Sequence, residues 1–211
     1  MIKISVKGLA KFITATEQGK RKVLRDFKFP DPEGAAQAMY YREARDLIEA
    51  HHRHGYASPW LQERAGALTQ LAQTMSGPSV VRLRNNARAL REYAAFWGDK
   101  PFEVLEGVRL GLRYGDVRIS VVPDLHVRDK GDERLIKLDF AAQEPDDRVP
   151  RIVGQAMFEA VSQSGLRTPA SSILYAHVAR GRIIRGARLG SRMAGEIQAA
   201  CGNIEAIWEK L

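Results

Sequence analysis

Two acidic residues and a lysine interrupt otherwise apolar stretches in the middle of this chain. Asp124 follows Pro123 at the end of one apolar run, and Lys137 and Asp139 stand two residues apart in the later run LIKLDF. Alternate residues of a β-strand point to the same face of a sheet, so Lys137 and Asp139 are expected to share a face. Charged side chains inside an apolar run need an ion partner, a bound metal or contact with solvent.

This arrangement suits two kinds of structure. If Asp124 lies on the same face, two carboxylates and an ammonium converge, and carboxylate oxygens are the ligands that Mg²⁺ and Mn²⁺ prefer. The alternative is a half-exposed strand whose polar face meets water, for which the same alternation is typical. The sequence therefore predicts either a metal site or a solvated sheet face at these residues.

The elements that would position these residues change character near residue 100. Before it, apolar residues recur at helical spacing over 35–55, 59–75 and 82–98, with Gly55 as a plausible helix end. After about residue 104, apolar and polar residues alternate, and Gly115-Asp116 is typical of a hairpin turn. A second turn at 129–132 makes the strand that carries Lys137 an antiparallel neighbour of the one before it.

The remaining residues complete a mixed α/β pattern. We expect an amphipathic helix over 149–166, a strand over 171–179, a short strand near 180–186 and a terminal helix from about Ser191. The predicted fold is thus a helical N-terminal region over residues 1–99, able to supply a further acid, and an α/β core with a C-terminal helix over residues 100–211.

Charge is distributed unevenly along the 211 residues, whose formal net charge is +8. Residues 1–100 carry 17 basic and 10 acidic side chains, residues 101–150 carry 8 and 11, and residues 151–211 carry 8 and 4. An acidic middle between basic arms is typical of a metal-using enzyme that acts on a polyanion, although basic helices can also be simply well solvated. The single cysteine, Cys201, excludes an internal disulfide and a cysteine zinc site, and no apolar run reaches the roughly 20 residues of a membrane span. We therefore expect a cytoplasmic protein with no membrane partner.

The segment ISVVPDLHVRDKGDERLIKLDF resembles the PD-(D/E)xK nuclease superfamily, which has the restriction-endonuclease-like fold. The shared features are a Pro-Asp at a strand end, a hairpin, and an apolar strand carrying an acid and a lysine two residues apart. Gln155 and Phe158 early in the next helix, followed by the strand SILYAHV, resemble the RecB-type branch of that superfamily. The resemblance covers about residues 104–180. In the family the acid precedes the lysine, whereas this chain has Lys137 before Asp139.

The resemblance implies hydrolysis of DNA phosphodiester bonds with Mg²⁺ or Mn²⁺, possible settings being genome defence or mobile-element processing. Asp124 and Asp139 would bind the metal, Lys137 would stabilise developing negative charge, and Gln155 would help to position the lysine or a phosphate. The family usually adds a glutamate from an upstream helix, for which Glu43 is the candidate. Glu103, Glu106 and Glu144 are alternatives to Glu43, and His126 is a further candidate ligand.

Arginines on both sides of the acidic middle are the candidate DNA contacts. They are Arg82, Arg84, Arg88, Arg180, Arg182, Arg185 and Arg188. Because the lysine and the acid are exchanged, the main alternative is a catalytically degenerate relative that binds DNA or serves as a subunit of a larger complex. A homo-oligomer is compatible with either function.

Overall fold

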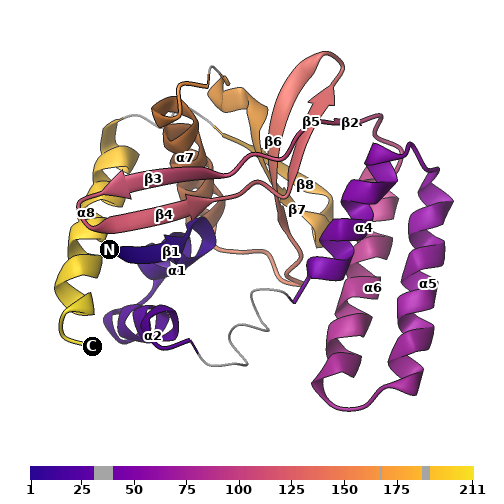
Figure 1. Ribbon diagram of the computed structural model, residues 1–211, viewed down its shortest axis with the longest axis horizontal. Helices are drawn as coiled ribbons and strands as arrows, with labels where there is room; N and C mark the ends of the chain where they lie inside the picture. Colours follow the sequence, from indigo (N-terminus) through magenta and orange to yellow (C-terminus); the bar gives the residue numbers. More distant parts are fainter. Residues whose placement is uncertain (31–39, 167, 187–190) are drawn as a thin grey trace.

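The chain forms two β-sheets with helices packed on both sides of the larger one (Figure 1). A computed structural model describes residues 1–30, 40–166, 168–186 and 191–211. The strands are β1 (Ile2–Ser5), β2 (Glu103–Val104), β3 (Leu110–Tyr114), β4 (Val117–Val121), β5 (Leu125–Asp129), β6 (Asp132–Asp139), β7 (Ile173–His177) and β8 (Arg182–Arg185). The helices are α1 (Val6–Thr14), α2 (Glu17–Lys28), α4 (Arg42–Arg53), α5 (Ser58–Thr74), α6 (Pro78–Trp97), α7 (Arg148–Gln163) and α8 (Ser191–Trp208), with short 3₁₀ turns at Ala170–Ser172 and Val178–Arg180.

The smaller sheet has the strand order β1-β4-β3, and the larger has the order β2-β5-β6-β7-β8. In the smaller sheet β1 runs parallel to β4, while β3 and β4 form an antiparallel hairpin. In the larger sheet β5 and β6 form a hairpin, β7 runs parallel to β6, and β8 returns antiparallel to β7. A parallel pair needs a crossover connection, which α7 provides between β6 and β7.

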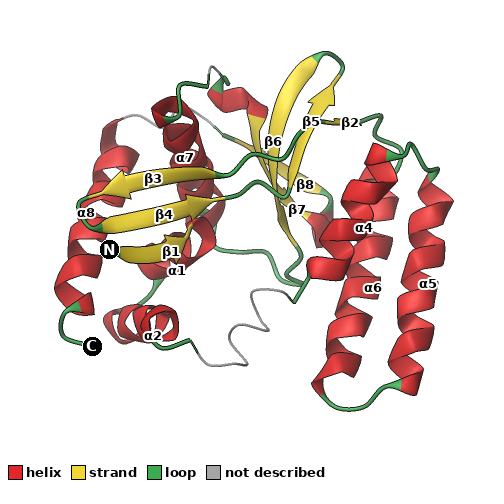
Figure 2. Ribbon diagram, viewed as in Figure 1, coloured by secondary structure: helices red, strands yellow, loops and turns green. Residues whose placement is uncertain are grey.

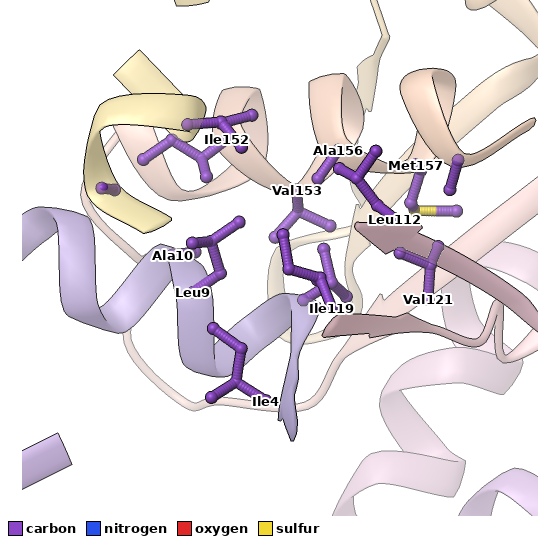
Figure 3. Close-up of a cluster of buried hydrophobic side chains, with 14 of the residues drawn as sticks. Ile4, Leu9, Ala10, Leu112, Ile119, Val121, Ile152, Val153, Ala156 and Met157 are labelled. Carbon is purple, nitrogen blue, oxygen red and sulfur yellow. The ribbon is translucent and has the colours of Figure 1, made fainter. Parts of the chain in front are cut away.

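Strand β6 separates two apolar clusters, because its alternate residues point to opposite faces. Leu135 belongs to a cluster that also contains α1, α7 and the smaller sheet (Figure 3). Ile136 and Leu138 face a second cluster, formed mainly with α4, α5 and α6. Fully burying a leucine or isoleucine side chain contributes about 1.5–3 kcal/mol, so both faces of this strand are strongly held.

The mixed α/β class predicted from the sequence is confirmed, and most of the predicted elements are present. The Gly115-Asp116 turn joins β3 to β4, and Gly55 lies just past α4 with a φ of 64°. That left-handed conformation is one that glycine adopts without steric cost. The helix expected over 35–55 is described only from residue 40, and there it begins at Arg42.

The expectation of a wholly helical region over residues 1–99 is wrong at its start. Ile2–Ser5 is a strand, and it pairs with β4, more than a hundred residues later in the sequence. Ile2 and Ile4 are buried while Lys3 and Ser5 are exposed, which is the period-2 pattern of a strand. Residues of β1, α1 and α2 share one apolar cluster with the smaller sheet, α7 and α8.

A pair of histidines is buried where α4 meets α6. The side chain of His52 lies in contact with Tyr93, whose hydroxyl is 2.7 Å from His52 Nε2, and its ring centroid is 5.0 Å from that of Phe102. Burial, reinforced by the neighbouring His51, lowers the pKa of His52 from 6.5 to about 4. Desolvation disfavours the charged imidazole, so this residue is neutral in the folded protein at ordinary pH.

We expect His52 to make the protein sensitive to acid. As the pH falls from 6.5 towards 4, the unfolded chain binds a proton at His52 that the folded chain does not bind, so the free energy of unfolding falls. The loss attributable to this residue reaches about 3 kcal/mol at the lower limit. Urea unfolding across this pH range should give a flatter profile for His52→Gln than for the wild type. His54→Gln, at an exposed position, is the matched control, and equal profiles for all three proteins would contradict the expectation.

Candidate functional site

Five elements bring charged side chains together at one end of strand β6. Lys137 and Asp139 lie on β6 itself, and Asp124 lies just before β5, where its backbone N–H donates to the Ile136 carbonyl at 2.8 Å. Lys7 comes from α1 and Arg45 from α4 (Figure 1). Tyr175 lies on β7, directly beside Lys137 in the parallel register. We call these six residues the charged cluster.

Asp124 is held by three donors and is almost fully buried. The Lys137 ammonium lies 3.2 Å from its Oδ1 and 3.1 Å from its Oδ2, and the side chain of Asp124 is only 6% exposed. The backbone N–H of Leu138 donates to Oδ2 at 2.8 Å, and Arg45 Nε lies 3.3 Å from Oδ1. The Lys137 ammonium also donates to the Val122 carbonyl at 2.9 Å. Lys137 is therefore bound between a carboxylate and a carbonyl oxygen.

Asp139 has a separate set of partners. The Lys7 ammonium lies 3.2 Å from Asp139 Oδ1 and also donates to the Leu138 carbonyl at 3.0 Å. The Tyr175 hydroxyl donates to Oδ2 at 2.8 Å. Both carboxylate oxygens of Asp139 are thus hydrogen-bonded within the protein.

The pKa values in the cluster follow from burial and from these neighbours. Burial lowers the pKa of Lys137, and the Asp124 carboxylate opposes that shift only in part. Burial alone would raise the pKa of Asp139, but the Lys7 ammonium and the Tyr175 hydroxyl outweigh it and leave the pKa below its usual value. Burial and then Asp139 raise the pKa of Tyr175, with a further contribution from Asp124. Both carboxylates therefore act on one tyrosine, and three cationic side chains surround two anionic ones.

The donor set of the charged cluster does not fit a divalent metal ion. The carboxylate oxygens of Asp124 and Asp139 are engaged by the side chains of Lys7, Arg45, Lys137 and Tyr175, which are cations or hydrogen-bond donors and not metal ligands. Throughout the described residues, no group of three or more His, Cys, Asp or Glu side chains is placed to hold a metal. A cation in the position between Asp124 and the Val122 carbonyl would have to displace the Lys137 ammonium.

The glutamates considered as a third ligand lie elsewhere. Glu43, on α4, forms an ion pair with Arg82 of α6. Glu103 pairs with Arg128 at 2.7 Å, and Glu144 lies 3.6 Å from Arg182. His126 lies between the Glu106 carbonyl at 2.5 Å and the Glu133 carboxylate at 2.8 Å. Glu103, Glu144 and His126 are thus engaged by other parts of the protein, and Glu106 contributes its backbone carbonyl. Glu43 is engaged only through Oε1, and its Oε2 is buried without a hydrogen-bond partner among the described residues.

Gln155 is buried on α7 and interacts with a neighbour on its own helix. Its side-chain amide donates to Glu159 at 2.8 Å, and Glu159 also accepts a hydrogen bond from the Tyr114 hydroxyl of β3. No hydrogen bond among the described residues joins Gln155 to Lys137. Its polar contacts therefore lie on the side of α7 that faces the smaller sheet.

The arginines expected to contact DNA divide into two groups. Arg82, Arg88 and Arg182 pair with acids of the protein, and Arg88 also donates to the Phe140 carbonyl at 2.9 Å. Arg84, Arg180 and Arg185 are exposed, and Arg188 lies outside the described residues.

The sequence analysis does not predict three members of the charged cluster, which are Lys7, Arg45 and Tyr175. Lys7 is 132 residues from its partner Asp139, so no local pattern links the two. Arg45 lies two residues after Glu43, the residue favoured by the family resemblance. The signal that could have found Tyr175 is the helix between its strand and the one that carries Lys137, because strands joined by a crossover helix pair in parallel. That pairing places Tyr175 beside Lys137.

No family model matches this chain, and no curated protein matches its sequence. Within the described residues, no helix is both long enough and apolar enough to cross a membrane.

We expect that replacing the ammonium by a carboxylate converts the charged cluster into a divalent-cation site. In Lys137→Glu the new acid would join Asp124 and the Val122 carbonyl, which are oxygen ligands of the kind that Mn²⁺ takes. Binding to the folded state alone raises the free energy of unfolding, by about 2.7 kcal/mol at 100 times the dissociation constant. Thermal unfolding with and without Mn²⁺ measures this gain.

The matched variant Lys137→Gln removes the same ammonium without adding a carboxylate, and we expect no Mn²⁺-dependent stabilisation of it or of the wild type. A wild-type protein that Mn²⁺ stabilises, with the effect lost in Asp139→Asn, would show that the site accepts a metal beside Lys137.

Proposed function

We propose that this protein binds DNA without cutting it, and that its core is a degenerate relative of the PD-(D/E)xK nucleases. The observation that carries the proposal is the position of Lys137. Its ammonium lies 3.1 Å from Asp124 and 2.9 Å from the Val122 carbonyl, among oxygen atoms that a hard cation would otherwise use. A protein cation thus replaces the metal ion that the family resemblance implies.

The order of elements supports the relationship to the nucleases. Asp124 precedes a hairpin, the second strand of that hairpin carries Lys137 and Asp139, and α7 then leads to a strand parallel to it. This is the order that the resemblance implies for a restriction-endonuclease-like core. The exchange of lysine and acid on β6 is the departure, and it puts an ammonium next to Asp124 where the family has a carboxylate.

The chemistry of the cluster argues against hydrolysis. A metal ion activates water by lowering the pKa of the water molecule that it binds. The Lys137 ammonium instead donates hydrogen bonds to Asp124 and to the Val122 carbonyl, and it does not activate water in this way. The six side chains instead join α1, α4, β5, β6 and β7 through ion pairs and hydrogen bonds. Lys137 and Asp124 thus stabilise the core, and binding must be carried by other surfaces.

The charge of the whole chain supports a nucleic-acid partner. The formal net charge is +8, and basic surfaces bind the phosphates of DNA with strong dependence on salt. Metal-dependent cleavage is the second candidate function, because Asp124 contacts Lys137 and Asp139 contacts Tyr175, the residue paired with Lys137 on the next strand. Both candidates fit the biological setting of genome defence or mobile-element processing.

A combined cleavage and binding assay separates the two functions. Wild type and Asp139→Asn are incubated with single- and double-stranded DNA and either Mg²⁺ or Mn²⁺, and retention of the DNA is measured at increasing salt. We expect intact DNA in every case, and retention that falls with salt equally for both proteins, with log affinity linear in log salt concentration.

Cleavage by the wild type that is lost in Asp139→Asn would overturn the proposal in favour of the nuclease. Absence of both cleavage and retention, with another chain co-purifying, would overturn it in favour of a subunit of a larger complex.

A further inference from the structure

The smaller sheet has one covered face and one open face. Its apolar residues, such as Ile4, Leu112 and Ile119, point into the cluster that contains α1, α7 and α8. Figure 2 shows strands β1, β3 and β4 side by side on the near side of α7. The opposite face carries six exposed residues, which are Lys3 and Ser5 of β1, Gly111 and Arg113 of β3, and Arg118 and Ser120 of β4.

The basic residues of this open face form a row across the sheet. In the strand register Lys3 is paired with Arg118, and Arg118 is paired with Arg113. The next row, Ser5, Ser120 and Gly111, has only small side chains. None of the three strands contains an acidic residue. Like charges directly opposite each other on neighbouring strands repel, so this row destabilises the free sheet.

The row differs in its partners from some other exposed basic residues, although Arg84, Arg180 and Arg185 likewise have no ion pair among the described residues. Arg42, Arg53 and Arg128 each form an ion pair with an acid, namely Asp46, Glu49 and Glu103. Among the described residues no ion pair involves Lys3, Arg113 or Arg118. Three adjacent cations with no acidic partner in the described part of the protein favour the binding of an external anion.

We propose that this open face is a docking surface for the sugar-phosphate backbone of double-stranded DNA, an inference that rests on the proposed function. Neighbouring strands lie about 4.8 Å apart, so the row covers about 10 Å. Over that length one strand of B-DNA presents about three phosphates. The residues of the row beside it are small, and the Arg118 guanidinium extends over Gly111 in that row, where it is open to a phosphate.

The same face favours duplex over single-stranded DNA. Binding of single strands relies on aromatic rings on which bases stack. The only aromatic residue of the three strands is Tyr114, which points the other way and donates its hydroxyl hydrogen to Glu159. Contacts to phosphate alone carry no sequence information, so the surface binds duplexes of any sequence.

The test compares two triple variants that lower the net charge by the same amount. One is Lys3→Gln/Arg113→Gln/Arg118→Gln, and the control is Arg42→Gln/Arg53→Gln/Arg128→Gln. Binding to a labelled duplex is measured over a range of salt concentrations by fluorescence anisotropy. Loss of three phosphate contacts should reduce the slope of log affinity against log salt by about 2 to 3 in the first variant and leave it unchanged in the control.

Folding of both variants is checked by circular dichroism and thermal unfolding. The first variant should unfold at or above the wild-type temperature, because it removes repulsion and no described ion pair. A clear fall in its unfolding temperature would show that the row has a structural role and would overturn the proposal.

Three binding results would also overturn it. If the wild type binds the duplex and the first variant binds equally well, the open face is not the docking surface, while the proposed function stands. If both variants lose the same affinity, net charge alone drives binding. If the wild type binds vesicles of anionic lipid but no duplex, the proposed function fails together with this surface.

Discussion

The ion pair between Lys137 and Asp124 is the interaction on which the centre of this structure depends. Asp124 is almost fully buried, and a buried carboxylate without a partner is costly. Lys137, Arg45 and the Leu138 N–H together compensate that cost and fix the start of β5 against β6. The same contacts put the Lys137 side chain at the place where the family resemblance implies a metal ion. The contacts between Lys137 and Asp124 therefore both hold β5 against β6 and occupy the oxygen atoms that a metal ion would need.

The sequence predicts the elements of this fold better than it predicts their partners. Hairpin turns, the crossover helix and the paired residues of β6 follow from local periodicity and turn chemistry. Strand β1 is missed because four residues, IKIS, carry too short a pattern to compete with the helix that follows them. Its position is fixed by pairing with β4, which is information that no local window contains.

In the charged cluster, too, the sequence predicts residues that are near one another in the chain but not their distant partners. The sequence places Asp124, Lys137 and Asp139 near one another because two of them share a strand and the third begins its neighbour. It does not indicate that Lys7 and Arg45 supply the remaining charges, since both arrive from helices far away in the chain. The balance of charge at a site depends on every element that reaches it. A pair of carboxylates in a sequence is therefore weak evidence for a metal until the cations around them are known.

The pairing of β1 with β4 has a consequence for how the protein is made. Strand β1 is synthesised more than a hundred residues before β4, the strand that it pairs with, and Lys7 precedes its partner Asp139 by 132 positions. Contacts of such long sequence separation slow folding, because a large loop must close before they form. The apolar residues Ile2, Ile4 and Leu9 remain without their native cover during that interval. Formation of the smaller sheet therefore depends on a contact between distant parts of the chain, and such contacts form slowly.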